Sequence, residues 1–134
     1  MMGGIRELAS QRVNFAFETT LASRSFAPWL RQLAASGYAV HLVYLWLPSA
    51  DFAVERVAER VRAGGHSVPS ATVRRRYAAG LRNFFKLYQP LVSGWVLYDS
   101  SGPVPRRVAE GLASHPPTVY DRDVWAAAQE QARP

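Results

Sequence analysis

Residues 39–47 have the sequence AVHLVYLWL, a nearly unbroken run of β-branched, aromatic and aliphatic side chains. Such a run is typical of a strand covered on both faces, and strands of that kind occur in parallel sheets flanked by helices. We therefore interpret this segment as a central strand of a parallel sheet. His41 lies inside the run, and we interpret it as a hydrogen-bonded core histidine rather than a ligand.

Two further strands and six helices are predicted around this run. Val13, Phe15 and Phe17 alternate with smaller residues, and residues 95–98 form a short apolar run, so both segments are expected to be strands. Apolar residues at helical spacing predict helices within 5–11, 25–37, 49–61, 67–91, 103–113 and 120–131. The resulting order, α-β-α-β-α-α-β-α with a last helix after it, predicts an α/β fold of three layers, with a parallel sheet between two layers of helices.

Length and composition limit the classes of protein that fit. The 134 residues suit one domain, and neither an internal repeat nor a long linker divides residues 1–134. Cysteine is absent, which excludes disulfides, thiolate catalysis and cysteine-based zinc sites. No apolar run approaches the ~20 residues that span a bilayer, and the N-terminal sequence lacks the apolar core of a signal peptide. We expect a cytoplasmic protein without membrane contact.

Residues 56–83, RVAERVRAGGHSVPSATVRRRYAAGLRN, concentrate positive charge around a Gly-Gly turn, in a chain of net charge +6. Guanidinium groups bind phosphate oxygens in bidentate fashion, and a mobile turn between two helices would let them close over a ligand. We expect this region to bind phosphate as a lid. The alternative is that its arginines are solvated helix surface.

The strand at residues 13–17 ends in Glu18, Thr19 and Thr20. In open parallel sheets, ligands bind just beyond the carboxyl ends of the strands, where these polar side chains would lie. We interpret this end of the strand as functional. A plain transition from strand to loop is the alternative.

Five segments carry a resemblance to a known family. They are FAFETTLASR at 15–24, the long strand ending in LP at 47–48, ERVAERVRAGGHSVP at 55–69, RRRYAAGLRNF at 74–84 and WVLYDSSG at 95–102. In this order they resemble the C-terminal two thirds of zeta-toxin-like P-loop kinases, over about residues 5–102. The resemblance implies the adenylate-kinase-like P-loop NTPase fold, ATP with Mg²⁺ as cofactors, and phosphoryl transfer. The best-known members of that family phosphorylate UDP-N-acetylglucosamine.

The resemblance also implies roles for individual residues. Glu18 matches a catalytic glutamate near substrate and magnesium, and Thr20 and Arg24 follow in the substrate-side loop. The nucleotide and phosphate side of the site would be formed by Arg56, Arg60, His66, Arg75, Arg76, Asp99 and Ser100. Among these, Arg60 matches an arginine of the first lid helix. His66 aligns with a second family arginine, and Arg75 or Arg76 would supply the charge of that arginine. Asp99 and Ser100 would border the adenine pocket. No metal-ligating residue is assigned.

The sequence departs from the family pattern in the N-terminal part of that pattern, which carries the phosphate loop. It contains neither GxxxxGKS nor GxxxxGKT, since its sole lysine, Lys86, follows Phe85, and no aspartate base precedes Glu18. Because phosphate-loop groups supply most of the catalysis in this class, we expect no kinase turnover from this chain alone. We interpret residues 1–134 as a truncated single domain that lacks the phosphate-loop strand, with 56–83 as lid region and 103–134 as C-terminal helices.

A missing strand would leave an exposed sheet gap, which predicts marginal stability and either self-association or docking of a partner. An antitoxin is the partner that the family implies. A second interpretation is a non-catalytic basic module, in which the arginines and Tyr77, Phe84 and Tyr88 hold nucleic acid. A regulatory partner of a complete kinase is a third.

Overall fold

The computed structural model describes residues 21–133, so the helix predicted at 5–11 and the strand predicted at 13–17 lie outside the described residues. Within this range the chain forms one sheet with the strand order β1-β2-β3-β4. The strands are β1 (His41–Trp46), β2 (Gly94–Asp99), β3 (Arg106–Leu112) and β4 (Thr118–Val119). β1 and β2 are parallel, whereas β3 and β4 pair in antiparallel fashion, so the sheet is mixed and not purely parallel.

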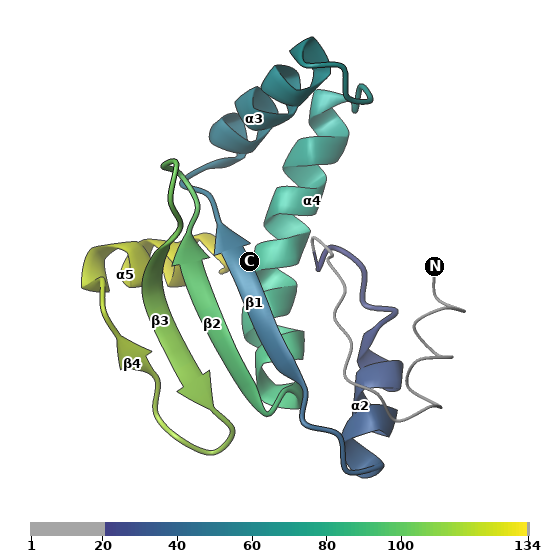
Figure 1. Ribbon diagram of the computed structural model, residues 1–134, viewed down its shortest axis with the longest axis vertical. Coiled ribbons are helices and arrows are strands. Elements are labelled where there is room, and N and C mark those ends of the chain that lie inside the picture. The colour runs from purple at the N-terminus through teal and green to yellow at the C-terminus, as the bar shows by residue number, and fades with distance from the viewer. Residues whose placement is uncertain (1–20, 134) are drawn as a thin grey trace.

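The α-helices are α2 (Ala27–Ala35), α3 (Ala50–Arg62), α4 (Ser70–Asn83) and α5 (Arg122–Gln131). In Figure 1, α4 and α5 lie behind this sheet, α3 lies above it and α2 lies to its lower right. α4 continues into a π-helix (Phe84–Tyr88) and a short 3₁₀-helix (Gln89–Leu91). α4 and α5 cover one face of the sheet, while α3 leaves the upper end of β1 and packs against the upper half of α4 (Figure 1).

Local sequence signals explain the helix ends. The Ser49 hydroxyl accepts a hydrogen bond from the Phe52 amide at 3.0 Å and so caps α3. The Asp121 carboxylate does the same for α5 through the Val124 amide at 3.1 Å. Both caps satisfy amide groups that have no partner within the helix, which fixes where each helix begins.

The core lies between the sheet and the helices behind it. Trp95 of β2 stacks on Trp125 of α5, with ring centres 5.4 Å apart, and contacts Phe84 of the π-helix edge to face. Phe84, Leu81 and Leu97 are fully buried. The helix predicted within residues 67–91 is therefore confirmed as α4 and its continuation, and Leu81 and Phe84 lie on its core face.

The helix predicted for residues 103–113 is wrong, and with it the description of 103–134 as C-terminal helices, because β3 is a strand. The Arg, Ala, Glu and Leu residues of this segment favour a helix locally, but its backbone pairs with the free edge of β2 instead. Gly111 is a signal that helical spacing overlooked. A Cβ atom there would lie 2.7 Å from the Trp95 indole nitrogen, so only glycine permits this close approach.

The three-layer arrangement is also not found among the described residues. The front face of the sheet carries no helix of the described chain (Figure 1). Val43 and Leu45 of β1 and Leu112 of β3 are more than half exposed, so β1 is not covered on both faces. His41 lies on the same exposed side and is not a core histidine. The continuous apolar run of β1 indicated burial that the described residues do not supply.

Candidate functional site

The carboxyl ends of β1 and β2 lie at the same edge of the sheet, since Trp46 is paired with Asp99 in the parallel register. β1 leads into α3 through Pro48 and Ser49, and β2 leads into the loop of residues 100–105. Ligands of open α/β sheets bind beyond such ends. The candidate site is therefore built from the first turns of α3 and the loop after β2.

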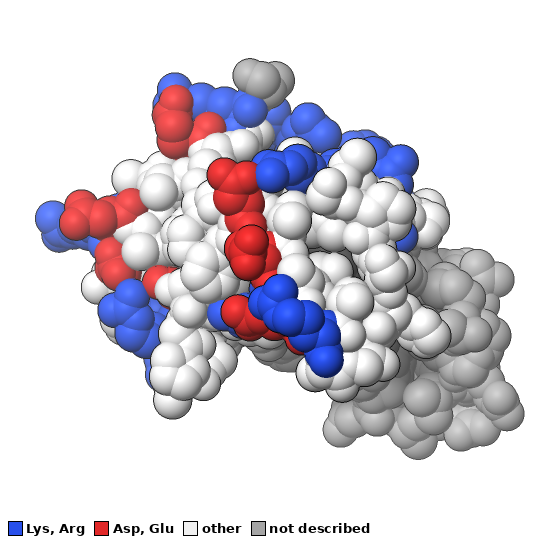
Figure 2. Space-filling view, turned by 90° about the horizontal axis from the view of Figure 1, so that it is seen from above, with Lys and Arg blue, Asp and Glu red and all other residues white. Residues whose placement is uncertain are grey.

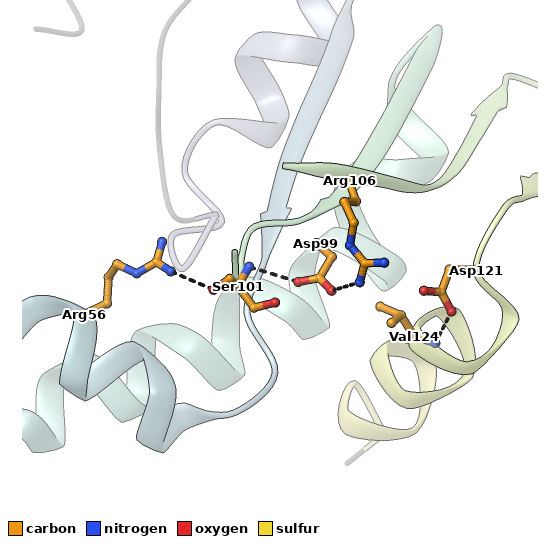
Figure 3. Close-up of polar contacts among 6 residues, drawn as sticks. All are labelled: Arg56, Asp99, Ser101, Arg106, Asp121 and Val124. Atoms are coloured by element: carbon orange, nitrogen blue, oxygen red, sulfur yellow. Dashed lines mark hydrogen bonds and ion pairs between the residues drawn. The ribbon is translucent and has the colours of Figure 1, made fainter. Parts of the chain in front are cut away.

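Arg56 joins these two parts (Figure 3). Its Nη2 atom donates to the Ser101 carbonyl oxygen at 3.4 Å, and its guanidinium lies 5.1 Å from the centre of the Phe52 ring. Beside these contacts is an open cavity of ≈ 540 Å³, lined by Phe52, Glu55, Arg56 and Glu59 of α3 and by residues 101–103. Helical spacing could have indicated Phe52, which precedes Arg56 by one turn.

The side chains around this cavity suit a base and a ribose better than a phosphate. The Phe52 ring and the Arg56 guanidinium offer flat surfaces for stacking. The carboxylates of Glu55 and Glu59 accept hydrogen bonds from amino or hydroxyl groups and repel anions. A phosphate chain is therefore expected to extend away from the glutamates, toward the arginines further along α3.

Asp99 shapes the loop beside the cavity, although Asp99 and Ser100 themselves do not line it. The Asp99 side chain is buried, and its two oxygens accept hydrogen bonds from the Ser101 amide at 2.9 Å and from Arg106 at 3.0 Å (Figure 3). Burial acts to raise the pKa of Asp99, but the bonds from Ser101 and Arg106 outweigh it, so the pKa lies below its ordinary value. Ser100 donates its amide to the Trp46 carbonyl at 2.9 Å, which ties the loop to β1.

α3 and α4, with their connecting residues 63–69, form the region predicted as a lid. Gly64 has a φ of +101° and donates to the Val61 carbonyl at 3.0 Å, while Gly65 donates to the Arg60 carbonyl at 2.7 Å. This is the Schellman pattern of helix termination. The two glycines thus form a compact, hydrogen-bonded helix end.

The predicted cations of this region are distributed over different sides. Arg60 lies one turn beyond Arg56 on α3 and is exposed. His66 is exposed in the connecting residues, and Arg75 and Arg76 are exposed on α4. None of these four side chains lines the cavity. The structure therefore places Arg56 at the cavity and Arg60 next to it along α3, and it does not bring His66, Arg75 or Arg76 to them.

Acidic side chains partly neutralise the positive charge of residues 56–83. Asp51, Glu55 and Glu59 recur every four residues on α3 and are exposed, so they line one face of this helix. Arg74 of α4 forms an ion pair with Asp51 at 2.6 Å. Seen from above, acidic groups run down the middle of the surface with basic groups beside them (Figure 2). The arginine-rich stretch therefore does not form one uniform basic patch.

Arg24 lies on a different part of the molecule, in the segment that precedes α2, and its side chain is exposed. Glu18 and Thr20, the other residues predicted for the substrate side, lie outside the described residues. The described chain thus separates the cavity at α3 from the segment predicted to lie on the substrate side, which is hydrogen-bonded to Asn83 of α4.

A hydrogen-bond network around Tyr77, in the middle of α4, was not predicted. The Gln131 side chain of α5 accepts from the Trp46 indole at 3.1 Å and donates to the Pro48 carbonyl at 2.8 Å. The Tyr77 hydroxyl lies 3.1 Å from the same Gln131 oxygen and donates to the Leu47 carbonyl at 2.7 Å. Burial raises the pKa of Tyr77 to about 12. This network ties α4 and α5 to the carboxyl end of β1, where the site begins.

Two further properties bear on cofactors and location. Within residues 21–133, no group of three or more His, Asp or Glu side chains is placed to hold a metal ion. Among the helices of that same range, none has the length and apolar character needed to cross a membrane.

Comparison with known proteins adds a family. The model of the family described as Zeta toxin matches residues 3–99. An uncharacterized protein of Haemophilus influenzae is 30% identical over 67 residues, which cover 50% of this chain and 48% of that protein. The chain thus matches about half the length of this relative. No solved structure matches the chain.

Proposed function

The chain belongs to the Zeta toxin family, and from this premise we propose that it carries the lid and acceptor side of an ATP-dependent kinase domain. The acceptor would be a UDP-sugar such as UDP-N-acetylglucosamine. The observation that carries the proposal is the cavity between α3 and the loop after β2, where Arg56 lies over Phe52 and reaches Ser101. It lies beyond the carboxyl ends of two parallel strands, where α/β folds bind nucleotides.

In this proposal the cavity takes the base and ribose of the nucleotide. Arg56 and Phe52 stack on the base, and Arg60 extends toward the phosphates from the next turn of α3. His66, Arg75 and Arg76 are further cations that movement of α3 and α4 would have to bring to the phosphates. ATP would supply the phosphoryl group and Mg²⁺ would neutralise its oxygens, with Glu18 as a carboxylate near the metal and Thr20 and Arg24 toward the acceptor.

We further propose that this chain alone does not turn over. The printed sequence contains no glycine followed by lysine, and Lys86 lies exposed in the π-helix, remote in sequence from any glycine-rich loop. A single charge-stabilising group is commonly worth ~10³-fold in phosphoryl transfer. Binding without turnover is therefore the expected behaviour. Phosphorylation of a UDP-sugar by the purified chain, abolished by Arg60→Ala, would contradict it.

Binding of ADP is the first test of the cavity. ADP is titrated into the wild type and into Arg56→Ala and Arg62→Ala by calorimetry. Both substitutions remove one guanidinium from α3, but Arg62 does not line this cavity. We expect Arg56→Ala to weaken ADP binding by ~10-fold, as for loss of a stacking cation and a charged hydrogen bond, and Arg62→Ala to leave it unchanged. Equal losses in the two variants would show nonspecific attraction to positive charge and refute the cavity.

Nucleic-acid binding is the second candidate, and one observation favours it. Arg75, Arg82 and Lys86 are exposed along α4 and its continuation, and no ion pair engages them within the described residues. The aromatic side chains predicted to stack on nucleic acid do not support this candidate, because Phe84 and Tyr88 are fully buried and Tyr77 is hydrogen-bonded to Leu47. Binding of an oligonucleotide that weakens steeply with salt and is reduced by Arg82→Ala would support this candidate over the kinase.

Association with another chain completes the proposal. Val43, Leu45 and Leu112 expose apolar surface on the front of the sheet, and large exposed apolar patches favour association. The chain that covers this surface would be either a second copy of the protein or a partner such as the antitoxin that the family implies. We propose that this association takes place in the cytoplasm. Light scattering of the purified chain distinguishes a dimer from a monomer.

A further inference from the structure

The segment before α2 has a strained backbone. Leu21 has a φ of +59° and is 3% exposed. A left-handed backbone at a bulky residue other than glycine costs roughly 1–2 kcal/mol and persists only where the surroundings hold it. Figure 1 shows this segment beside α4.

Two buried polar side chains hold three consecutive carbonyl groups of this segment. The Asn83 side-chain nitrogen donates to the carbonyl oxygens of Leu21 at 2.7 Å and Ala22 at 3.2 Å. The Tyr88 hydroxyl donates to the carbonyl oxygen of Ser23 at 2.5 Å. Asn83 is 6% exposed and Tyr88 is fully buried. Bonds from buried donors are costly to lose, because water does not readily replace them.

The π-helix explains how both side chains reach the same segment. Asn83 is the last residue of α4, and Tyr88 is the last residue of the π-helix. In an α-helix, residues five apart lie on different sides, whereas the i→i+5 pattern of a π-helix returns them to the same side. Such turns are rare and frequently occur at functional sites.

Arg24 directly follows the held segment. Burial raises the pKa of the Tyr88 phenol, while a backbone hydrogen bond at Phe26 and the positive charge of Arg24 act in the opposite direction. The Arg24 side chain is exposed and free to meet a ligand.

We propose that Asn83 and Tyr88 are positioning residues for the acceptor substrate: through the backbone of residues 21–23 they hold Arg24 where it binds the diphosphate of a nucleotide sugar. This rests on the proposed function, because it assumes that the segment contacts the acceptor. It assigns the π-helix the role of building the acceptor side of the site, separately from the cavity at α3.

The test combines Tyr88→Phe, which keeps the ring and removes only the hydroxyl, with Asn83→Leu, which keeps a similar volume. Tyr120→Phe is the matched control, because its exposed hydroxyl bonds Glu110 on β3, away from this segment. Trypsin cleavage after Arg24 is followed by mass spectrometry, with cleavage after Arg62 as internal reference. Affinities for UDP-N-acetylglucosamine and for ADP are measured on the same samples.

In Tyr88→Phe and Asn83→Leu we expect cleavage after Arg24 to accelerate by ~10-fold, the equivalent of one hydrogen bond, with cleavage after Arg62 unchanged. The affinity for UDP-N-acetylglucosamine falls by ~10-fold while that for ADP is retained. In a double-mutant cycle, Tyr88→Phe causes little further loss once Arg24 is replaced by Ala, because it acts through that residue.

Three outcomes would overturn the positioning role. The first is an unchanged rate of cleavage after Arg24 in Tyr88→Phe. The second is an equal loss of affinity for UDP-N-acetylglucosamine and for ADP. The third is a double variant whose loss of UDP-N-acetylglucosamine affinity equals the product of the losses in Arg24→Ala and Tyr88→Phe. If Asn83→Leu does not fold, Tyr88→Phe alone decides between these results. A wild-type chain that binds no UDP-sugar would instead refute the proposed acceptor, and the cleavage rates would still decide whether Tyr88 and Asn83 hold the segment.

Discussion

Asp99 is expected to stabilise the fold by more than its ion pair alone. The side chain is 5% exposed, and it binds both the Ser101 amide and the Arg106 guanidinium. Hydrogen bonds to a charged group contribute about 1.5–3 kcal/mol. The partner Arg106 is 68% exposed, so its share is closer to the ~0–1 kcal/mol of a surface ion pair. Asp99→Ala should therefore cost about 2–3 kcal/mol of unfolding free energy, and Arg106→Ala less than about 1 kcal/mol.

The dependence on pH provides a second measure. The folded pKa of Asp99 lies below its ordinary value, because the bonds from Ser101 and Arg106 outweigh the burial that would raise it. Its stabilisation is therefore complete above the unfolded pKa of about 3.9 and is lost as pH falls through the folded pKa. The difference in stability between wild type and Asp99→Asn should be largest near neutral pH and should shrink below about pH 4.

Urea unfolding monitored by tryptophan fluorescence measures both effects, since Trp29, Trp46, Trp95 and Trp125 are buried. Titrations are run near neutral pH and at pH values on both sides of about 4. An Arg106→Ala variant that is less stable than Asp99→Ala would refute the reasoning. So would a difference between wild type and Asp99→Asn that stays constant on acidification.

Three other predictions concern the region around the site. Gln131→Ala should cost about 1–2 kcal/mol in urea unfolding, because the buried Trp46 indole loses its acceptor, whereas Gln129→Ala on the same helix should be nearly neutral. Gly65→Ala should lower the melting temperature, since its Cβ would lie 2.9 Å from the Arg60 carbonyl oxygen, whereas Gly102→Ala meets nothing within 4 Å. Burial raises the pKa of Tyr77 to about 12. The stabilisation by Tyr77 should therefore be complete below about pH 10 and be lost as pH rises through about 12. Alkaline unfolding followed by circular dichroism should show this loss in the wild type and not in Tyr77→Phe.

Much of the fold was predictable because its elements carry strong local patterns. The apolar strand at residues 39–47 and the amphipathic spacing of residues 67–91 correspond to β1 and to α4 with its continuation. Both patterns depend on which side chains face the core, and the order of apolar and polar residues indicates those side chains. Residues 103–113 were predicted wrongly because their helix propensity stabilises a helix less than pairing with the edge of β2 stabilises a strand.

The candidate site was predicted only in part. Arg56 was expected to bind phosphate, and the structure places it over Phe52 and against Ser101 beside a cavity that also contains two glutamates. The window of residues 56–83 suggested a more basic surface than exists, because Asp51 and Glu55 precede it on the same helix. A window that begins at Arg56 leaves out these two carboxylates. The ion pair of Arg74 with Asp51 also joins positions 23 apart, which a linear window does not reveal.

The sequence by itself determined the family, the positions of most helices and strands, and the concentration of arginine on two helices, since each follows from the order of residue types. Only the tertiary structure decided that the sheet is mixed, that Asp99 is satisfied by Ser101 and Arg106, and that Asn83 and Tyr88 hold the backbone of residues 21–23. Asn83 and Leu21 are 62 positions apart. A hydrogen bond over that separation depends on the path of the whole intervening chain, including the π-helix turn that no local pattern indicated.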